Sequence, residues 1–157
     1  MLKKDIEKKF DVIKTYVDRD VPKIIGEESK REFKQNFVDE SFNGQKWKDV
    51  QRRDPASPWY GHSGQTGKKS ESRKKAKILD GETGELRNAT TWRQNGKNVI
   101  ISNDKPYAKV HNEGGIAKIY GKKTFIMPRR QFIGTSQRLE KNIHDKITRD
   151  IANIIKS

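Results

Sequence analysis

The first forty residues carry apolar side chains at the spacing of an α-helix. Steps of four, three, four and four residues place them on one face: Ile6, Phe10, Ile13, Val17 and Val21. The pattern predicts an N-terminal helix whose apolar face packs into the core. Pro22 predicts a break or kink at residues 20–22, because proline disfavours helical backbone in the residue before it.

A second helix is predicted after this break. Ile25, Phe33 and Phe37 lie on a compatible face, and we expect them to join the core. Gly26 weakens the early part of this helix, since glycine lowers helix propensity. The helix should end by residues 41–44.

Residues 44–77 show neither a helical nor a strand period. They are rich in Gly, Pro, Ser and charge, and they hold ten Lys and Arg against three acids. This composition predicts a long, basic, flexible loop that is partly disordered. Trp47, Trp59 and Tyr60 are its exceptions, and they are candidates for docking onto the fold.

The following segment, up to residue 127, predicts two β-hairpins. Thr83 is a candidate cap for a short helix that starts near Gly84 and carries Leu86. TTWRQNGKNVIIS (90–102) predicts a hairpin turning at Asn95-Gly96, because Asn-Gly is the strongest short turn signal. Residues 116–127 predict a second hairpin turning at Gly121-Lys122.

A short helix is predicted between the hairpins, at residues 105–112. Pro106 suits its first turn, and Gly114 and Gly115 suit its end. We expect Tyr107, Val110 and His111 to face inward from it.

The C-terminal segment gives the clearest helix, capped by Ser136 or Thr135. Its apolar face comprises Leu139, Ile143, Ile147, Ile151 and Ile154. Strands in the middle and helices at the ends indicate the α+β class. The predicted architecture is N-terminal helices, a central antiparallel sheet of about four strands (two hairpins) with a short helix between them, and a long C-terminal helix. We predict a single domain over residues 1–157.

The composition of the chain limits the kinds of binding partner and site that we expect. The 157 residues carry a net charge of +14, with 31% hydrophobic and 36% charged residues and no cysteine. The charge favours an anionic partner, and the lack of cysteine excludes disulfides, Cys-based zinc sites and a Cys nucleophile. No apolar run approaches the roughly 20 residues that span a bilayer, and no secretion signal is present, so we expect no membrane partner.

Catalytic patterns are weak. The three histidines are His62, His111 and His144, none of them four residues from another, and no HExxH motif occurs. The His111-Asn112 pair occurs in nuclease centres with a histidine base, but the supporting metal ligands are missing here. GQTGKKS (64–70) lacks the buried strand and apolar helix of a phosphate-binding loop. We therefore predict no enzyme, no catalytic or metal residue and no cofactor.

The basic loop is the more credible functional feature. Its cationic residues can neutralise phosphates without reading sequence, and Trp59 and Tyr60 can stack on bases. The cationic residues that are candidates for contact with DNA are Lys68, Lys69, Arg73, Lys74 and Lys75. The alternative is a solvated loop that keeps the protein soluble.

Four segments in one order resemble the phage virion morphogenesis family, the tail-completion and head–tail joining proteins of long-tailed phages and prophages. They are FNGQKWKDVQ (42–51), ILDGETGELRNAT (78–90), ISNDKPYAKVHNEGG (101–115) and MPRRQFIGTSQ (127–137). Two departures are the insertion at residues 80–82 and Asn112-Glu113, where many relatives carry a glutamine and an aromatic residue.

The resemblance implies a non-enzymatic virion protein that completes the tail or joins tail to head. It implies a homo-oligomeric ring, with tail tube, neck or connector proteins as partners and non-specific contact with passing DNA. It places the protein in the bacterial host cytoplasm during assembly and then in the virion, at the tail or the head–tail junction. The motif residues it assigns a structural role are Pro106, Tyr107, His111, Gly114, Gly115, Pro128 and Phe132. A sequence-independent basic nucleic-acid-binding module is the alternative, and a nuclease using His111 ranks third.

Overall fold

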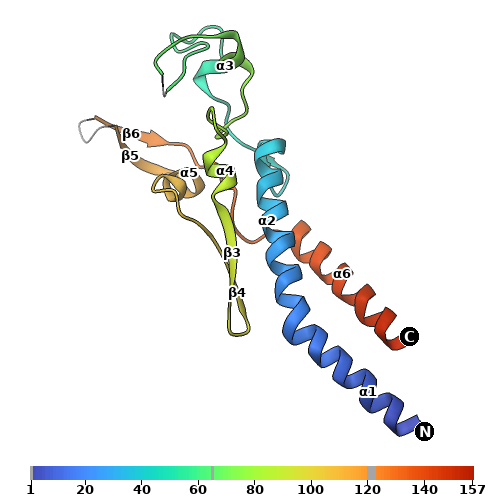
Figure 1. The fold of residues 1–157 in the computed structure, drawn as a ribbon. Helices are drawn as coiled ribbons and strands as arrows, with labels where there is room; N and C mark the ends of the chain where they lie inside the picture. The colour runs from blue at the N-terminus through green and yellow to red at the C-terminus, as the bar shows by residue number, and fades with distance from the viewer. Residues whose placement is uncertain (1, 65, 120–122) are drawn as a thin grey trace. The chain divides into compact units, whose positions relative to one another are not determined.

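The computed structural model describes residues 2–64, 66–119 and 123–157 (Figure 1). The α+β class is confirmed, with helices at both ends and strands in between. In chain order the elements are α1 (Leu2–Thr15), η1 (Tyr16–Asp20), α2 (Val21–Asp39), β1 (Ser41–Phe42), β2 (Gln45–Lys46), η2 (Gln51–Arg53), α3 (Glu71–Lys75), α4 (Glu85–Asn88), β3 (Thr90–Asn95), β4 (Asn98–Asn103), α5 (Ala108–Glu113), β5 (Gly115–Ile119), β6 (Lys123–Met127) and α6 (Gln137–Lys156).

The chain folds into two compact units that interleave along the sequence. The first unit takes residues up to Glu32, Thr90–Ser102 and Thr135–Ser157, and the second takes Phe33–Ala89 and Asn103–Gly134. That both units form one domain stays a prediction.

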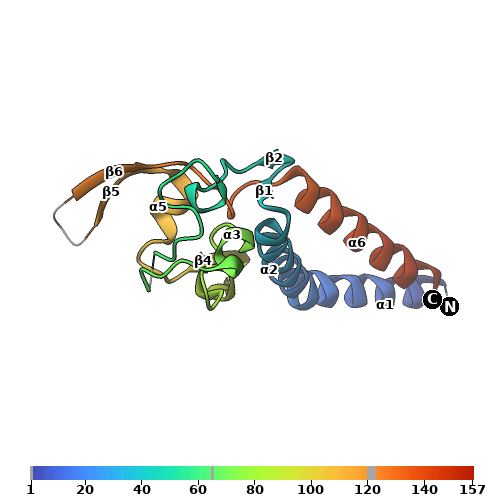
Figure 2. The ribbon, with the colours of Figure 1, turned by 90° about the horizontal axis from the view of Figure 1, so that it is seen from above.

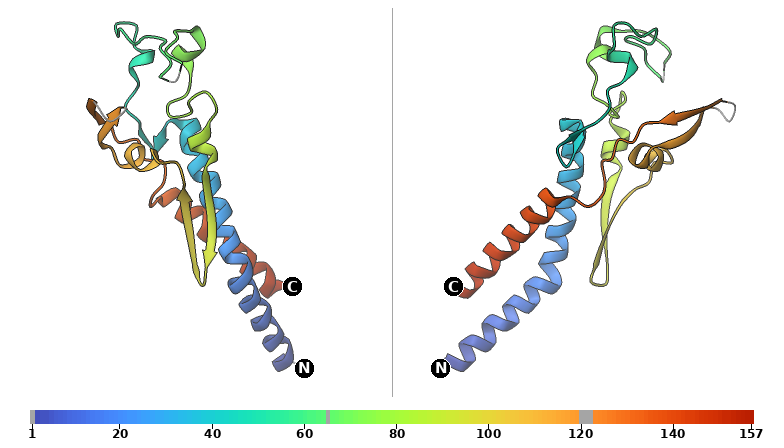
Figure 3. Two further views of the ribbon diagram at one scale, coloured as in Figure 1. Left: turned by 60° about the vertical axis from the view of Figure 1, so that its left-hand side comes forward. Right: turned by 180° about the vertical axis from the view of Figure 1, so that it is seen from behind.

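The helical run over residues 2–39 is irregular where the sequence predicts a break. Tyr16–Asp20 form a π-helical turn, in which the Val21 N–H donates to the Tyr16 carbonyl. Pro22 lacks an N–H and cannot continue the ladder there. The helix axis bends at this turn (Figure 3), as π-bulges and prolines commonly cause.

The predicted burial of the N-terminal apolar face is wrong for most of its members. Ile6 is 48% exposed, Phe10 68% and Val17 44%. The neighbour of α1 in this unit is α6, which lies beside it (Figure 2), and a single helix covers only part of such a face. The Tyr16 hydroxyl ties the pair by donating to Asp150 Oδ2 at 2.8 Å.

Gly26 lowers the helix propensity of α2, but it allows close packing at this position of the helix. It is buried on α2 where β3 passes, and a Cβ built there would lie 2.1 Å from Cδ2 of Trp92. The Trp92 indole N–H donates to Glu27 Oε1 at 2.8 Å. The missing side chain therefore lets the indole lie directly on the helix backbone.

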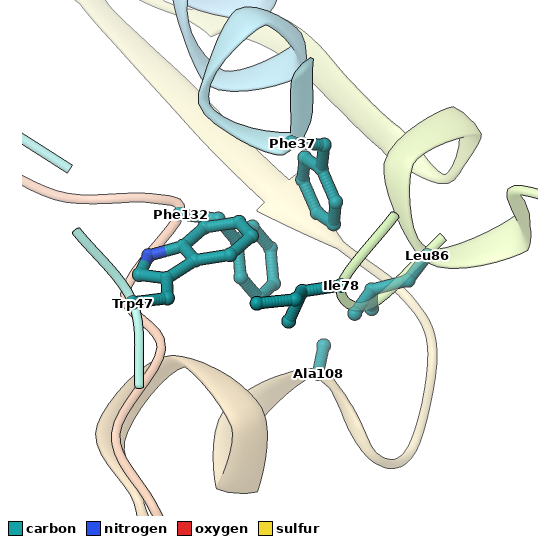
Figure 4. Packing of buried hydrophobic residues seen from close by; sticks show 6 residues of the cluster. All are labelled: Phe37, Trp47, Ile78, Leu86, Ala108 and Phe132. Atoms are coloured by element: carbon teal, nitrogen blue, oxygen red, sulfur yellow. The ribbon is translucent and has the colours of Figure 1, made fainter. Parts of the chain in front are cut away.

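The second unit holds the main apolar cluster, drawn in Figure 4. Phe37 packs edge-on against Trp47, with ring centroids 5.6 Å apart, and tilted against Phe132 at 5.0 Å. Ile78, Leu86 and Ala108 complete the cluster. The burial predicted for Phe33 and Phe37 is confirmed, and Trp47 docks onto the fold and donates its indole N–H to the Gln131 carbonyl at 2.8 Å.

Residues 44–77 form a chain of hydrogen-bonded turns with two short helices, η2 and α3. Arg53 ties this segment down, because its guanidinium Nη1 donates to Glu40 Oε2 at 2.9 Å and its Nη2 to the Ala76 carbonyl at 2.8 Å. Hydrogen bonds from Arg53 are the main reason that the pKa of Glu40 is lowered. Whether the segment is flexible stays a prediction.

The strands of the described residues form three separate two-stranded antiparallel sheets, β1–β2, β3–β4 and β5–β6. Both predicted hairpins are present, but the expectation that they share one four-stranded sheet is wrong, since they belong to different units. The β3–β4 loop begins at Gly96, one residue later than predicted. The predicted turn at Gly121-Lys122 lies outside the described residues. The β1–β2 hairpin was not predicted, although its Asn43-Gly44 turn has the positive φ values, 49° and 78°, that this dipeptide favours.

The end signals of two predicted helices are informative. Ser136 caps α6, its hydroxyl accepting from the Leu139 N–H at 3.2 Å, as predicted. The cap of α4 is Gly84, in the left-handed region with φ 66°, rather than Thr83.

Candidate functional site

The PYAKVHNEGG segment (106–115) forms a turn, the short helix α5 and a glycine bend. The helix begins at Ala108, three residues after the predicted start, so Ala108 enters the core while Tyr107 is exposed, contrary to its predicted inward position. Gly114 has φ 74°, and a Cβ there would lie 2.9 Å from the backbone nitrogen of Arg129. Glycine is therefore required where the chain turns into β5.

His111 lies inside this segment in a largely buried position. Its ring packs edge-on against Tyr107 at 5.9 Å, and its carbonyl accepts the Arg130 N–H at 2.8 Å. Burial, and secondly the charge of Arg130, lower the pKa of His111. Its Nδ1 is buried and has no hydrogen-bond partner among the described residues. Burial and the charge of Arg130 both favour the neutral form of the imidazole.

Asn112 and Arg130 connect the segment to distant parts of the chain. Asn112 Oδ1 accepts from the backbone N–H groups of both Phe132 and Ile133 at 2.9 Å. Arg130 is only 6% exposed, and its Nε donates to the Lys48 carbonyl at 2.9 Å. The sequence reasoning missed both roles, for it considered Asn112 as part of a catalytic-looking pair and as a departure from the family pattern, and assigned no role to Arg130.

Arg52, Arg73, Arg130 and His111 line one hollow of about 340 Å³ in the second unit, called the arginine hollow below. Arg52 Nη2 donates to the carbonyls of Ala76 and Lys77 at 2.9 and 2.8 Å. Burial, and next the charge of Arg73, lower the pKa of Arg52 to about 10. Sequence reasoning missed Arg52, whose only signal was its place in a basic segment.

The five predicted DNA-facing residues divide into three groups. Lys68, Lys69 and Lys75 are exposed. Lys74 pairs with Glu71 and places its Nζ 4.5 Å from the ring centre of Tyr60. Arg73 turns inward to the hollow, where its Nη1 donates to the Gly81 carbonyl at 2.8 Å.

The β5–β6 hairpin carries an exposed apolar pair. Ile116 and Ile126 lie directly opposite each other in the strand register, so they share one face, and they are 76% and 82% exposed. The hairpin extends away from α5 (Figure 2). Of the two motif residues after it, Pro128 lines a second hollow beside the arginines, and Phe132 is buried in the core.

Two further findings concern sites of other kinds. Within the described residues, no group of three or more histidine, aspartate or glutamate side chains is arranged to hold a metal ion. None of the described helices is both long and apolar enough to cross a membrane.

These features define a small, basic α+β protein in which the His111-Asn112 pair hydrogen-bonds to the backbone of residues 130–133. The sequence model of the phage virion morphogenesis family matches residues 12–152, and the chain belongs to this family. The resemblance drawn from the four sequence segments is thereby confirmed, and membership supports a role in phage virion assembly. The comparisons found no match among curated proteins or solved structures.

Proposed function

We propose that this protein is a non-enzymatic structural subunit that completes the tail of a long-tailed phage or joins the tail to the head. Several copies form a ring that contacts tail tube, neck or connector proteins. Assembly takes place in the cytoplasm of the bacterial host, and the protein then stays in the virion at the tail or the head–tail junction.

Family membership supports the virion role, and the observation that carries assembly into an oligomer is the exposed Ile116–Ile126 pair on β5–β6. Each of these strands has one edge without a partner strand among the described residues. Exposed apolar pairs on open strand edges favour pairing with another chain. An isolated two-stranded hairpin is also only marginally stable in water. Contact with a neighbouring subunit would cover the apolar pair and the open strand edges, and it would stabilise the hairpin.

The test measures assembly directly. The mass of the full chain is followed by light scattering over a wide concentration range, with negative-stain images of the same fractions. Ile126→Glu should abolish or weaken the oligomer, because it places a charge on the contact face. Thr91→Glu, which adds the same charge at an exposed strand position, is the matched control. A closed ring that survives Ile126→Glu unchanged would contradict the role given to the hairpin.

A second candidate function, sequence-independent nucleic-acid binding, is favoured by the exposed Lys68, Lys69 and Lys75. Replacing all three by Gln should reduce the dependence of duplex-DNA affinity on salt by up to about 0.9 per lost phosphate contact in the log–log slope. Arg73 and Lys74 are left intact because they have partners within the fold. An unchanged slope would assign these lysines a solubilising role only.

The absence of enzymatic activity is part of the proposal. A nuclease based on His111 predicts metal-dependent DNA cleavage that His111→Ala abolishes. We expect the wild-type protein to show no such cleavage with Mg²⁺, Mn²⁺ or Zn²⁺, and cleavage that is lost in the variant would overturn this part.

A further inference from the structure

Three guanidinium groups gather at one place in the second unit. Arg52, Arg73 and Arg130 together line both the arginine hollow and the second hollow beside it. They come from distant parts of the sequence, η2, α3 and the segment after β6. After burial, the charges of Arg73, Arg53 and Arg130 contribute to lowering the pKa of Arg52, and the charge of Glu40 partly offsets them. The fold therefore holds like charges together against their mutual repulsion.

The acids that line the arginine hollow do not balance this charge. They are Asp80 and Glu85, and each already faces another cation. Asp80 Oδ1 lies 3.4 Å from Arg87 Nε, and Glu85 Oε2 lies 3.4 Å from Lys105 Nζ. The three arginines bond instead to backbone carbonyls, which satisfy N–H groups and carry no formal charge. Asp49, which lines the second hollow, partly offsets the charge of Arg130. In the arginine hollow, three arginines against two acids leave a net positive charge.

Hydrogen-bond donors also remain unused at this place. The Nε–H groups of Arg52 and Arg73 are buried and have no acceptor among the described residues. The Nδ1 atom of His111 and the carboxylate Oδ1 of Asp80 are also buried there without a hydrogen-bond partner. A buried polar group without a partner is costly, and a buried charge more so. An anion in the hollow would reduce both costs, since it supplies acceptor oxygens and negative charge together.

We propose that the arginine hollow binds the phosphate group of a ligand. A phosphate dianion matches several guanidiniums better than a carboxylate does, because its oxygens point in several directions and its charge balances more than one cation. The volume of about 340 Å³ is at the lower end of the range for ligand pockets, which suits a single small group. The proposal is independent of ring formation and of the exposed lysines.

Isothermal titration calorimetry of the full chain with sodium phosphate tests the proposal, against sodium chloride of equal ionic strength. We expect saturable binding of one phosphate per chain and a rise in Tm that chloride does not reproduce. Arg73→Gln should weaken binding at least about tenfold, the typical effect of losing one hydrogen bond to a charged group. Lys75→Gln removes the same charge from an exposed position of the same helix and should leave binding unchanged.

Arg73→Lys separates charge from geometry, and it also guards against a folding defect in Arg73→Gln. It keeps the charge and loses the Nε donor, so its affinity should fall between those of the wild type and Arg73→Gln. Circular dichroism confirms that each variant is folded. The proposal is overturned if the wild-type chain shows no saturable response beyond matched chloride, or if Arg73→Gln and Lys75→Gln weaken binding equally.

The phosphate group can belong to a nucleic-acid strand or to a free phosphate ion. Fluorescence anisotropy with a labelled oligothymidylate distinguishes these sources. If the strand enters the hollow, inorganic phosphate competes with it and Arg73→Gln weakens its binding more than Lys75→Gln does. If phosphate binds without competing, the hollow is a site for the free ion, and any strand binding occurs elsewhere.

Discussion

Substituting Gly26 by alanine should destabilise the protein, although alanine is the better helix former. The change alone would favour the helix by about 1 kcal/mol. The new Cβ, however, would lie 2.1 Å from Cδ2 and 2.5 Å from Cε2 of Trp92. The indole must therefore move away from α2.

The magnitude follows from three contributions. Overpacking costs roughly 1–3 kcal/mol, and losing the hydrogen bond from Trp92 to Glu27 costs roughly 0.5–1.5 kcal/mol. After subtraction of the propensity gain, we expect a net loss of roughly 0.5–3.5 kcal/mol in the free energy of unfolding.

Urea unfolding followed by far-UV circular dichroism measures this loss. The same substitution should also be made in the Trp92→Ala variant, which lacks the indole that the new Cβ would meet. In that variant Gly26→Ala should stabilise the protein by about 1 kcal/mol. Lys23→Ala, at an exposed position of the same helix, is the control and should change stability by less than about 0.5 kcal/mol. A stabilising effect of Gly26→Ala in the wild-type background would refute the packing argument.

Substitutions at three further positions test the segment around His111 and the start of α6. The pKa of His111 is lower in the folded protein than its ordinary 6.5, so the unfolded chain binds more protons and stability falls as pH drops from 6.5 toward the lowered value; His111→Gln should flatten that part of a stability profile measured by urea unfolding. Asn112→Ala leaves two backbone N–H groups without their acceptor and should cost roughly 2–5 kcal/mol in chemical unfolding, whereas Asn112→Asp keeps the acceptor and should lose less than half as much. Ser136→Ala removes the cap of α6 and should cost about 1 kcal/mol of stability in thermal unfolding. Ser136→Thr keeps a hydroxyl group and should therefore retain most of that stability. Equal losses in the two variants would argue against a capping role.

The long terminal helices could be predicted from the sequence because their signals are local, whereas η2 and α3 lie in the segment predicted as a loop. The apolar face of α6 and its Ser136 cap lie within a few residues of each other, and Pro22 marks the irregular turn. Burial could not be predicted in the same way. Whether Phe10 is covered depends on how many neighbours α1 has, which periodicity does not state. For the same reason, two correctly predicted hairpins did not reveal that they form separate sheets.

The arginine hollow was beyond prediction for a different reason. Arg52 and Arg130 stand among many basic residues, and composition counts each as surface charge. Their roles come from contacts with backbone carbonyls far along the chain, such as Ala76 for Arg52 and Lys48 for Arg130. Because every residue has a backbone carbonyl, the sequence does not indicate which carbonyl accepts a hydrogen bond from a given arginine. The glycine bend at Gly114 was predictable because the bend depends on that residue's own backbone.

The interleaving of the two units constrains the order in which the protein can fold during its synthesis. The first unit needs Thr135–Ser157 to complete it, although its opening segment ends at Glu32. At roughly 5–20 residues per second, the ribosome adds the intervening hundred or so residues in about 5–20 s. During that interval α1 exists without α6, and Ile6 and Phe10 have even less cover than in the finished fold. A nascent chain of this protein therefore depends on its last segment, and premature termination would leave the first unit unfinished.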